Sequence, residues 1–157
     1  MNEINLKPVA TVFNSRAGME DDNWGEVSSE IVLGEEFSQE SLSGLEEFSH
    51  LEIIFYFDRV KDSELYYGAR HPRGNTDWPK IGIFAQRGKN RPNKMGLSIV
   101  RLLGVNGKTI TVSGMDAIDG TPVLDIKPVM REFLPREEVA QPTWATELMK
   151  NYWNLKK

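Results

Sequence analysis

Four basic residues lie within an eleven-residue stretch, QRGKNRPNKMG (86–96), of a chain whose formal net charge is −4. Arg87 and Arg91 can each form paired hydrogen bonds to a carboxylate or a phosphate. Gly88 and Gly96 let the backbone turn and approach a ligand closely. The stretch therefore predicts an anion-binding loop, although a loop in which every cation faces water remains an equal alternative.

The basic character extends upstream of this loop. Residues 70–94 hold seven Lys and Arg residues against one acid, Asp77, a net charge of +6, while the remaining residues carry −10. A local patch of this kind matters more for partner choice than the overall charge does. It predicts a surface for a polyanion such as RNA, where phosphate contacts provide salt-sensitive affinity.

A second chemically rich stretch is MDAIDGTPVLDIKP (115–128), which contains Asp116, Asp119 and Asp125. Its Asp-Gly-Thr-Pro segment predicts a turn, and the acid spacing does not match an EF-hand calcium loop. The chain has no cysteine and two histidines, which excludes a multi-histidine or cysteine-ligated metal site. His50, beside Ser49, is interpreted as a structural histidine, and no metal is expected.

Short β-rich segments separated by turns must position these stretches. Asn106-Gly107 is typical of a tight hairpin turn, residues 41–50 predict a short helix or turn, and residues 62–80 form a long loop. These features indicate a mainly β protein, a compact antiparallel barrel or sandwich. The expected strands span 8–13, 27–33, 51–57, 81–85, 97–105, 108–113 and 122–126.

The end of the chain differs from the rest. Pro142-Thr143 predicts a helix start with Thr143 as N-cap, followed by an apolar stripe through Trp144, Leu148 and Tyr152. We expect this helix to dock on the barrel or on a partner subunit. No segment is long and apolar enough to span a membrane, and the absence of cysteine favours a reducing, cytoplasmic location.

Three stretches together resemble the TsaA-like family, whose best-known members are the TrmO-type tRNA methyltransferases: GLEEFSHLEIIFYF, IGIFAQRGKNRPNKMGLSIVRLLGV and GMDAIDGTPVLDIKP. The resemblance covers residues 8–135. It implies a small single-sheeted antiparallel β-barrel domain at 1–135, a C-terminal helical extension at 136–157, and a homodimer. It also implies S-adenosyl-L-methionine (SAM) as cofactor and methylation of the exocyclic nitrogen of N6-threonylcarbamoyladenosine, next to the anticodon of tRNA.

The resemblance also implies site residues. The cofactor contacts carried over are Asp22, Asn23, Trp24, Asp58, Arg59, Arg87, Leu97, Asp119, Thr121, Pro122, Val123 and Leu124. The residues expected to face the tRNA or its modified base are Arg70, Arg73, Lys89, Arg91, Asn93, Lys94, Asp125 and Lys127. The chain departs from the family where Asp22-Asn23-Trp24-Gly25 replaces a PRQPG-like segment, and where NRPNKMG replaces FRPNPIG.

Residue chemistry suggests how such a cofactor could be held. The carboxylate of SAM suits Arg87, its ribose suits Asp58 or Asp119, and its sulfonium suits an aromatic face such as that of Trp24. Two other functions stay open: a SAM-dependent methyltransferase of a small molecule, and a non-enzymatic SAM-binding or partner-binding module that docks through residues 144–153.

Overall fold

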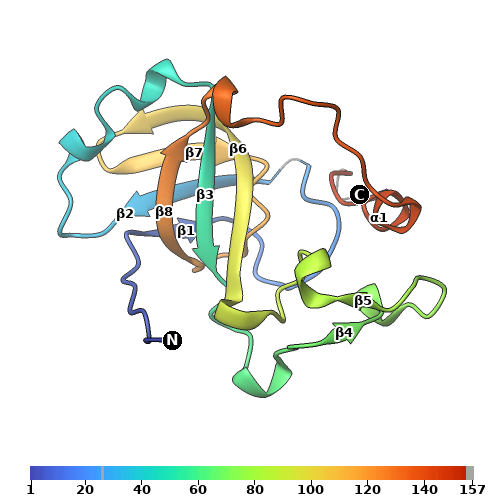
Figure 1. The fold of residues 1–157 in the computed structure, drawn as a ribbon. Helices are drawn as coiled ribbons and strands as arrows, with labels where there is room; N and C mark the ends of the chain where they lie inside the picture. Colours follow the sequence, from blue (N-terminus) through green and yellow to red (C-terminus); the bar gives the residue numbers. More distant parts are fainter. Residues whose placement is uncertain (26, 155–157) are drawn as a thin grey trace.

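Six strands close into an antiparallel barrel in the order β1-β2-β7-β6-β3-β8 (Figure 1). The structure is a computed structural model and describes residues 1–25 and 27–154. The predicted residues 155–157 of the C-terminal extension lie outside the described part. The barrel strands are β1 (Ala10–Phe13), β2 (Ser28–Leu33), β3 (His50–Tyr56), β6 (Met95–Asn106), β7 (Thr109–Ser113) and β8 (Pro122–Pro128).

Alternation along the strands explains the barrel interior. Leu51, Ile53 and Phe55 of β3 are 0–2% exposed, and the residues between them are partly exposed. Along every strand, alternate side chains point into the barrel, and together they form one core. At Gly96, a Cβ would lie 2.4 Å from the Phe55 ring, so only glycine fits where β6 passes that ring.

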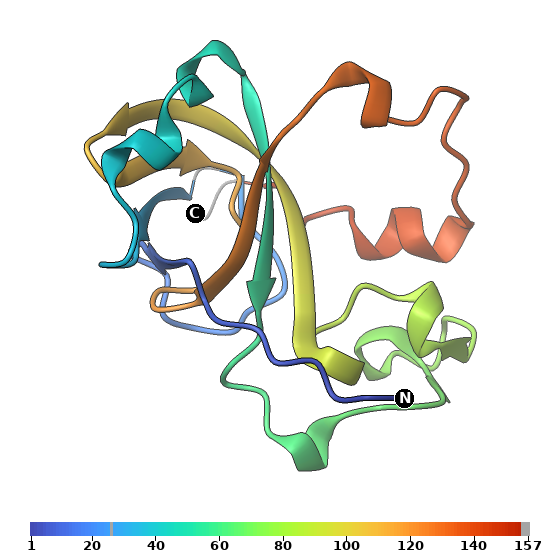
Figure 2. The ribbon, with the colours of Figure 1, turned by 60° about the vertical axis from the view of Figure 1, so that its left-hand side comes forward.

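The hairpin prediction is confirmed, because β6 and β7 pair antiparallel. Its turn lies one residue later than predicted: Asn106 pairs with Thr109, and Gly107, with φ 61°, and Lys108 form the loop. The strand expected at residues 81–85 is wrong beyond its first two residues. There β5 (Ile81–Gly82) pairs only with β4 (Ala69–Arg70), and Ile83–Ala85 forms a 3-10 helix. This two-stranded sheet projects from the barrel beside β6 (Figure 2).

Short helical turns occupy most connections. The 3-10 helices span Gln39–Leu42, Leu45–Glu47, Asp62–Glu64, Pro72–Gly74, Ile83–Ala85, Pro92–Lys94 and Arg131–Phe133. Leu45–Glu47 falls within the region predicted as a short helix or turn (residues 41–50), and Gln39–Leu42 overlaps its start. Within the described residues, no helix is long and apolar enough to cross a bilayer, and no group of three metal-ligating side chains is present.

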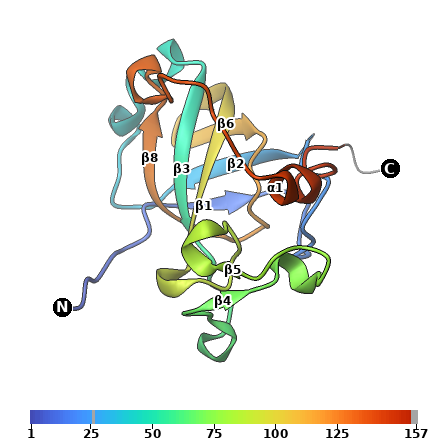
Figure 3. The ribbon, with the colours of Figure 1, turned by 45° about the vertical axis from the view of Figure 1, so that its right-hand side comes forward.

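The C-terminal tail (residues 136–154) follows the 3-10 helix Arg131–Phe133 and ends beside the β1–β2 connection (Figure 3). Its helix, α1, spans Thr143–Leu148 and is shorter than the predicted stripe, so Tyr152 lies in the turns that follow it. The predicted N-cap is wrong: Pro142 occupies that position with no side-chain cap, and Thr143 is the first helical residue.

Candidate functional site

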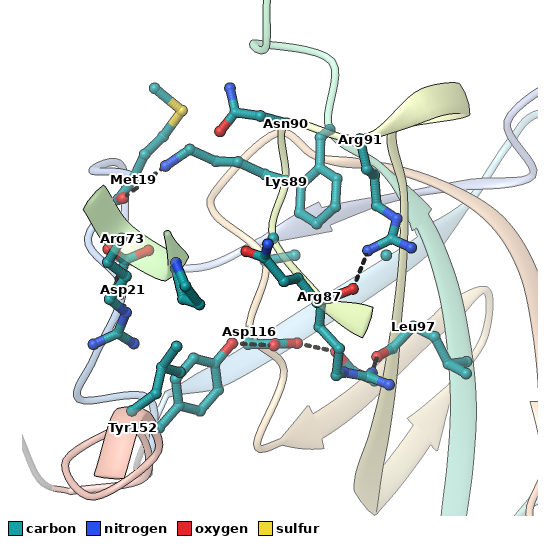
Figure 4. A pocket seen from close by; sticks show the side chains of 18 of the residues that line it. Met19, Asp21, Arg73, Arg87, Lys89, Asn90, Arg91, Leu97, Asp116 and Tyr152 are labelled. Atoms are coloured by element: carbon teal, nitrogen blue, oxygen red, sulfur yellow. Dashed lines mark hydrogen bonds and ion pairs between the residues drawn. The ribbon is translucent and has the colours of Figure 1, made fainter. Parts of the chain in front are cut away.

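A cleft of about 1050 Å³ opens on the side of the barrel, where β6 faces the segments next to the β4–β5 sheet. Its walls come from the barrel strands, the β7–β8 connection, residues 58–74 and 84–85, the basic loop (residues 86–94), the β1–β2 connection (residues 14–25) and the C-terminal tail. Figure 4 shows side chains from these parts converging on one space. The cleft thus brings together both of the chemically rich stretches of the sequence.

Arg87 lies on the barrel side of the cleft. Its Nη2 donates a hydrogen bond of 2.7 Å to the carbonyl oxygen of Leu97 on β6, which orients the guanidinium (Figure 4). A guanidinium has five N–H donors, so donors remain for a ligand after this bond is made. Arg87 is therefore a cation oriented by the barrel and able to bind a carboxylate.

The other cations of the cleft are held by main-chain oxygens or by an aromatic ring. Arg91 Nη1 donates to the Gln86 carbonyl oxygen at 2.7 Å, and Lys89 Nζ lies 3.5 Å from the Met19 carbonyl oxygen. The Arg70 guanidinium sits 4.3 Å from the Tyr66 ring centroid. These contacts orient the three side chains and leave their charges unneutralised by those partners.

Arg73 behaves differently, because an acidic loop neutralises it. Its guanidinium makes paired bonds of 3.2 and 2.9 Å to the Asp22 carboxylate, and its Nε lies 3.8 Å from Asp21. The acidic residues at 21–22 and the basic segment at 70–94 thus partly cancel each other. The local charge available to a polyanion is smaller than the sequence alone implies.

A carboxylate with two hydroxyl partners lies on the cleft wall. Ser98 Oγ donates to Asp116 Oδ1, and the Tyr152 hydroxyl donates to Asp116 Oδ2 (Figure 4). Burial raises the pKa of Asp116, while the Tyr152 bond and the charge of Arg87 act in the opposite direction. Burial and the Asp116 charge together raise the pKa of Tyr152, so the phenol remains a proton donor.

The C-terminal tail closes one side of the cleft. The Asn23 and Trp24 amides donate to the carbonyl oxygens of Asn151 and Tyr152 at 3.1 and 2.7 Å. On the other side of α1, Trp78 Nε1 donates to Glu147 Oε2 at 2.7 Å. The tail is thereby bonded to the β1–β2 connection and to the β4–β5 connection.

Half of the predicted site residues line the cleft. They are Trp24, Asp58, Arg59, Arg87, Leu97 and Thr121 from the predicted cofactor set, and Arg70, Arg73, Lys89 and Arg91 from the predicted substrate set. The structure does not bring the others to the cleft wall: Asp22, Asn23, Asp119, Pro122, Val123 and Leu124, and Asn93, Lys94, Asp125 and Lys127.

Several of the outlying residues have structural roles in the barrel. Val123 is fully buried in the core, and Pro122 pairs with Thr11 on β1. The adjacent Leu124 is partly buried on β8. Further along β8, Lys127 and Asp125 form an ion pair of 2.7 Å.

Three other predicted residues shape turns. Asn93 and Lys94 have positive φ angles of 63° and 48°, and Lys94 Nζ pairs with Asp62 at 2.6 Å. That pairing raises the pKa of Lys94. The Asp119 carboxylate accepts a hydrogen bond from the Asn14 amide at 3.0 Å, so it is engaged in holding the β1–β2 connection.

Two residues that line the cleft also make structural contacts with other parts of the chain. Trp24 is 4% exposed, and the Arg16 guanidinium lies 3.7 Å from its ring centroid. One ring face thus already holds a cation, so that face cannot receive a sulfonium. Arg59 donates to the carbonyl oxygens of Ala17 and Asp119 at 3.2 and 3.0 Å, joining the end of β3 to the β7–β8 turn.

Sequence reasoning missed the cluster of Asp116, Ser98 and Tyr152. Asp116 belonged to the acidic stretch already noted, but nothing near it in the sequence distinguishes it from Asp119 or Asp125. Its two partners come from β6 and from the tail, 18 and 36 residues away. Only the folded chain brings them together.

Comparisons with known proteins agree with this architecture. A family model, the tRNA-methyltransferase O N-terminal domain, matches residues 9–133. The human tRNA (adenine(37)-N6)-methyltransferase is 40% identical over 113 residues, which are 72% of this chain and 25% of that protein. A probable S-adenosyl-L-methionine-binding protein of Methanothermobacter thermautotrophicus is 35% identical over 130 residues, which are 80% of this chain and 90% of that protein.

Solved structures show the same fold. The crystal structure of TrmO from Pseudomonas aeruginosa has a TM-score of 0.72 and 27% sequence identity, and the match covers 92% of this chain and 63% of that one. The chain spans about a quarter of the length of the mammalian relatives that it matches.

Proposed function

Because the chain belongs to the tRNA-methyltransferase O N-terminal domain family, we propose that it transfers the methyl group of SAM to N6 of adenosine 37 in tRNA. The observation that carries this proposal is the cleft, in which Arg87 and the rest of the basic loop meet Leu97 and the β7–β8 turn. One relative is named for tRNA methylation and another for SAM binding, and both support the proposal.

The residues of the cleft fit SAM. The volume of about 1050 Å³ is sufficient for a nucleoside-sized ligand, and Arg87 offers oriented donors for its carboxylate. Asp58 is an exposed acid at the cleft edge and suits ribose hydroxyls, because the Asp119 carboxylate is used elsewhere. When bound, SAM supplies an activated methyl group on a sulfonium.

In this proposal the chain aligns the reactants and excludes water. Methyl transfer needs the attacking nitrogen held in line at about 3–3.5 Å. Leu97 and Phe57 provide apolar surface in the cleft, and the tail covers one side. The apolar lining disfavours water, while Arg87 sets the position of the donor.

The basic residues of the cleft provide a surface for tRNA phosphates. Arg70, Lys89 and Arg91 line the cleft without an acidic partner among the described ion pairs. Such contacts give affinity that falls with salt and carry little base selectivity. If the acceptor adenosine carries a threonylcarbamoyl group, its carboxylate offers Arg91 a second, bidentate partner.

We also propose that the protein works as a homodimer in the cytoplasm, with residues 1–135 as the catalytic domain and 136–157 as an extension. Leu97 and Ile99, which border the cleft, and Leu103 are 42–53% exposed along one face of β6, with Arg101 between Ile99 and Leu103. An apolar row of this kind favours burial against a second copy. Light scattering after size exclusion tests this, and a monomeric mass at micromolar concentration would refute it.

Nucleoside profiling tests the proposed function directly. We expect tRNA from cells lacking the gene to lose one N6-methylated adenosine derivative, and the purified chain with SAM to restore it. Unchanged tRNA nucleosides together with SAM-dependent methylation of a small molecule would replace tRNA with a metabolite acceptor. A chain that binds SAM and methylates nothing would indicate a binding module.

A further inference from the structure

We propose that Asp116 is the catalytic residue that takes up the proton released by the acceptor nitrogen. This inference rests on the function proposed above. It starts from the placement of Asp116 on the cleft wall, between Ser98 and Tyr152, with Arg87 close enough to act on its charge.

The loop holds this carboxylate rigidly. Met115 and Ala117, its neighbours in the chain, are 0% and 3% exposed, so both are anchored in the core. The Asp116 side chain points from this anchored segment into the cleft (Figure 4). Two hydroxyl donors then fix its two oxygens, one on each. A carboxylate held in this way is preorganised for proton transfer.

The reaction requires a proton acceptor. The lone pair of an adenine N6 is delocalised into the ring, so the nitrogen attacks well only as its proton leaves. In the transfer, the nitrogen electron pair forms the N–C bond, the C–S bond breaks, and its electron pair stays on sulfur. The N–H proton passes to an Asp116 carboxylate oxygen. Charge and atoms balance without any further reactant.

Other acids of the cleft are less suited to this role. Asp58 is exposed to solvent. Asp21 lies beside Arg73, and Glu20 lies beside Arg16, at 3.8 and 3.4 Å. Burial makes Asp116 a stronger base than an ordinary carboxylate, because its pKa is raised. Asp116 combines partial burial with two hydroxyl partners.

Tyr152 is a positioning residue in this scheme. It donates to Asp116 Oδ2 and thereby lowers the pKa of Asp116 relative to a carboxylate without that bond. The charged and polar groups that face the pair are Arg87 from the basic loop, Ser98 from β6 and Asp21 from the β1–β2 connection. Removing the phenol should shift the titration of Asp116 upward while leaving the base in place.

The test is a pH profile of single-turnover methyl transfer with the full chain. The reagents are tritium-labelled SAM and total tRNA from cells lacking the gene, and the variants are Asp116→Asn, Tyr152→Phe and, as a matched control, Asp77→Asn. Asp77 is exposed and outside the cleft lining. SAM affinity by calorimetry and thermal unfolding are measured for each variant.

We expect Asp116→Asn to keep SAM affinity within threefold and to lose about 10²–10⁴-fold in rate. The wild-type rate should fall at low pH as Asp116 becomes protonated; this acidic limb of the pH profile should be absent from Asp116→Asn. Tyr152→Phe should keep the limb and move it to higher pH, and Asp77→Asn should match the wild type. An Asp116→Asn rate within threefold of wild type, or a wild-type limb that Tyr152→Phe leaves in place, would overturn the inference alone. A wild-type chain that methylates no tRNA would overturn the proposed function, and the inference with it.

If Asp116→Asn fails to fold, Tyr152→Phe still decides the question. It removes one hydroxyl and leaves the carboxylate and Ser98 in place. A limb displaced upward supports proton uptake by Asp116, whereas an unmoved limb at reduced rate assigns Asp116 to anchoring the tail.

Discussion

Gly25 packs directly against the main chain of Trp153, 128 residues later, and a Cβ placed on it would lie 2.0 Å from the Trp153 carbonyl oxygen. The neighbouring Trp24 amide donates to the Tyr152 carbonyl oxygen. The tail therefore lies on the β1–β2 connection at a distance that only glycine permits. This contact sets the position of Tyr152 opposite Asp116.

Gly25→Ala should displace the tail, because the atom in the way belongs to the backbone and cannot rotate aside. We expect a loss of about 1–3 kcal/mol in the free energy of unfolding and faster tryptic cleavage within residues 136–154. Gly68→Ala is the matched control, since nothing lies within 4 Å of its Cβ position. Equal proteolysis of the two variants would show that the tail is not held at Gly25.

Arg87→Ala should weaken SAM binding about 10- to 100-fold, because a charge-assisted pair to the SAM carboxylate contributes about 1.5–3 kcal/mol. Isothermal calorimetry measures this. Arg101→Ala, on the exposed face of β6 and outside the cleft, should leave the affinity unchanged. An Arg87→Ala affinity within twofold of wild type would assign the SAM carboxylate to another group.

Affinity for tRNA should fall steeply with salt, and Lys89→Ala should reduce the slope of log affinity against log salt by about 0.7. Filter binding at salt concentrations between about 50 and 200 mM measures the affinity for tRNA and gives this slope. Lys108→Ala, in the β6–β7 hairpin and away from the cleft, is the control. A wild-type slope near zero would exclude phosphate contacts as the source of affinity.

The free energy of unfolding should depend on pH through the ionisation of Asp116. Its folded pKa is raised above the unfolded value, so the folded state binds more protons in the window between the two values. Stability attributable to this group is therefore present below the unfolded pKa and is lost as pH rises through the folded pKa. Asp116→Asn removes that loss.

Urea unfolding of wild type and Asp116→Asn from about pH 4 upward checks the sign. The free energy of unfolding of the variant, relative to wild type, should increase with pH across the window. A difference that stays constant or decreases would mean that Asp116 ionises in the folded protein as easily as in the unfolded chain.

Local patterns were sufficient for much of the barrel. Asn106-Gly107 specified its hairpin, and the hydrophobic run at residues 51–57 specified a buried strand, because turn chemistry and alternation act over a few residues. The resemblance to a known family supplied closure of the sheet into a barrel. The two-residue strand at Ala69–Arg70 escaped detection and the strand at 81–85 was predicted too long, since such short pairings leave no periodicity.

The candidate site was less predictable because its decisive contacts are long-range. The acidic Asp22 was expected to face the cofactor, yet it pairs with Arg73, 51 residues away. Lys94 was assigned to the substrate from its charge. In the structure it lies in a turn where Asn93 and Lys94 have positive φ angles, and its amine pairs with Asp62. The choice of partner for a charge depends on the folded chain, so sequence alone cannot distinguish a free cation from a paired one.

The placement of the four tryptophans has a practical consequence. Trp24, Trp144 and Trp153 line the cleft, and Trp78 bonds to the helix that borders it, whereas the barrel core is built from Phe55 and aliphatic side chains. Intrinsic emission therefore reports on the cleft and hardly at all on the barrel. A purine stacked in that space should quench the fluorescence, so the chain provides its own label-free optical sensor for ligands.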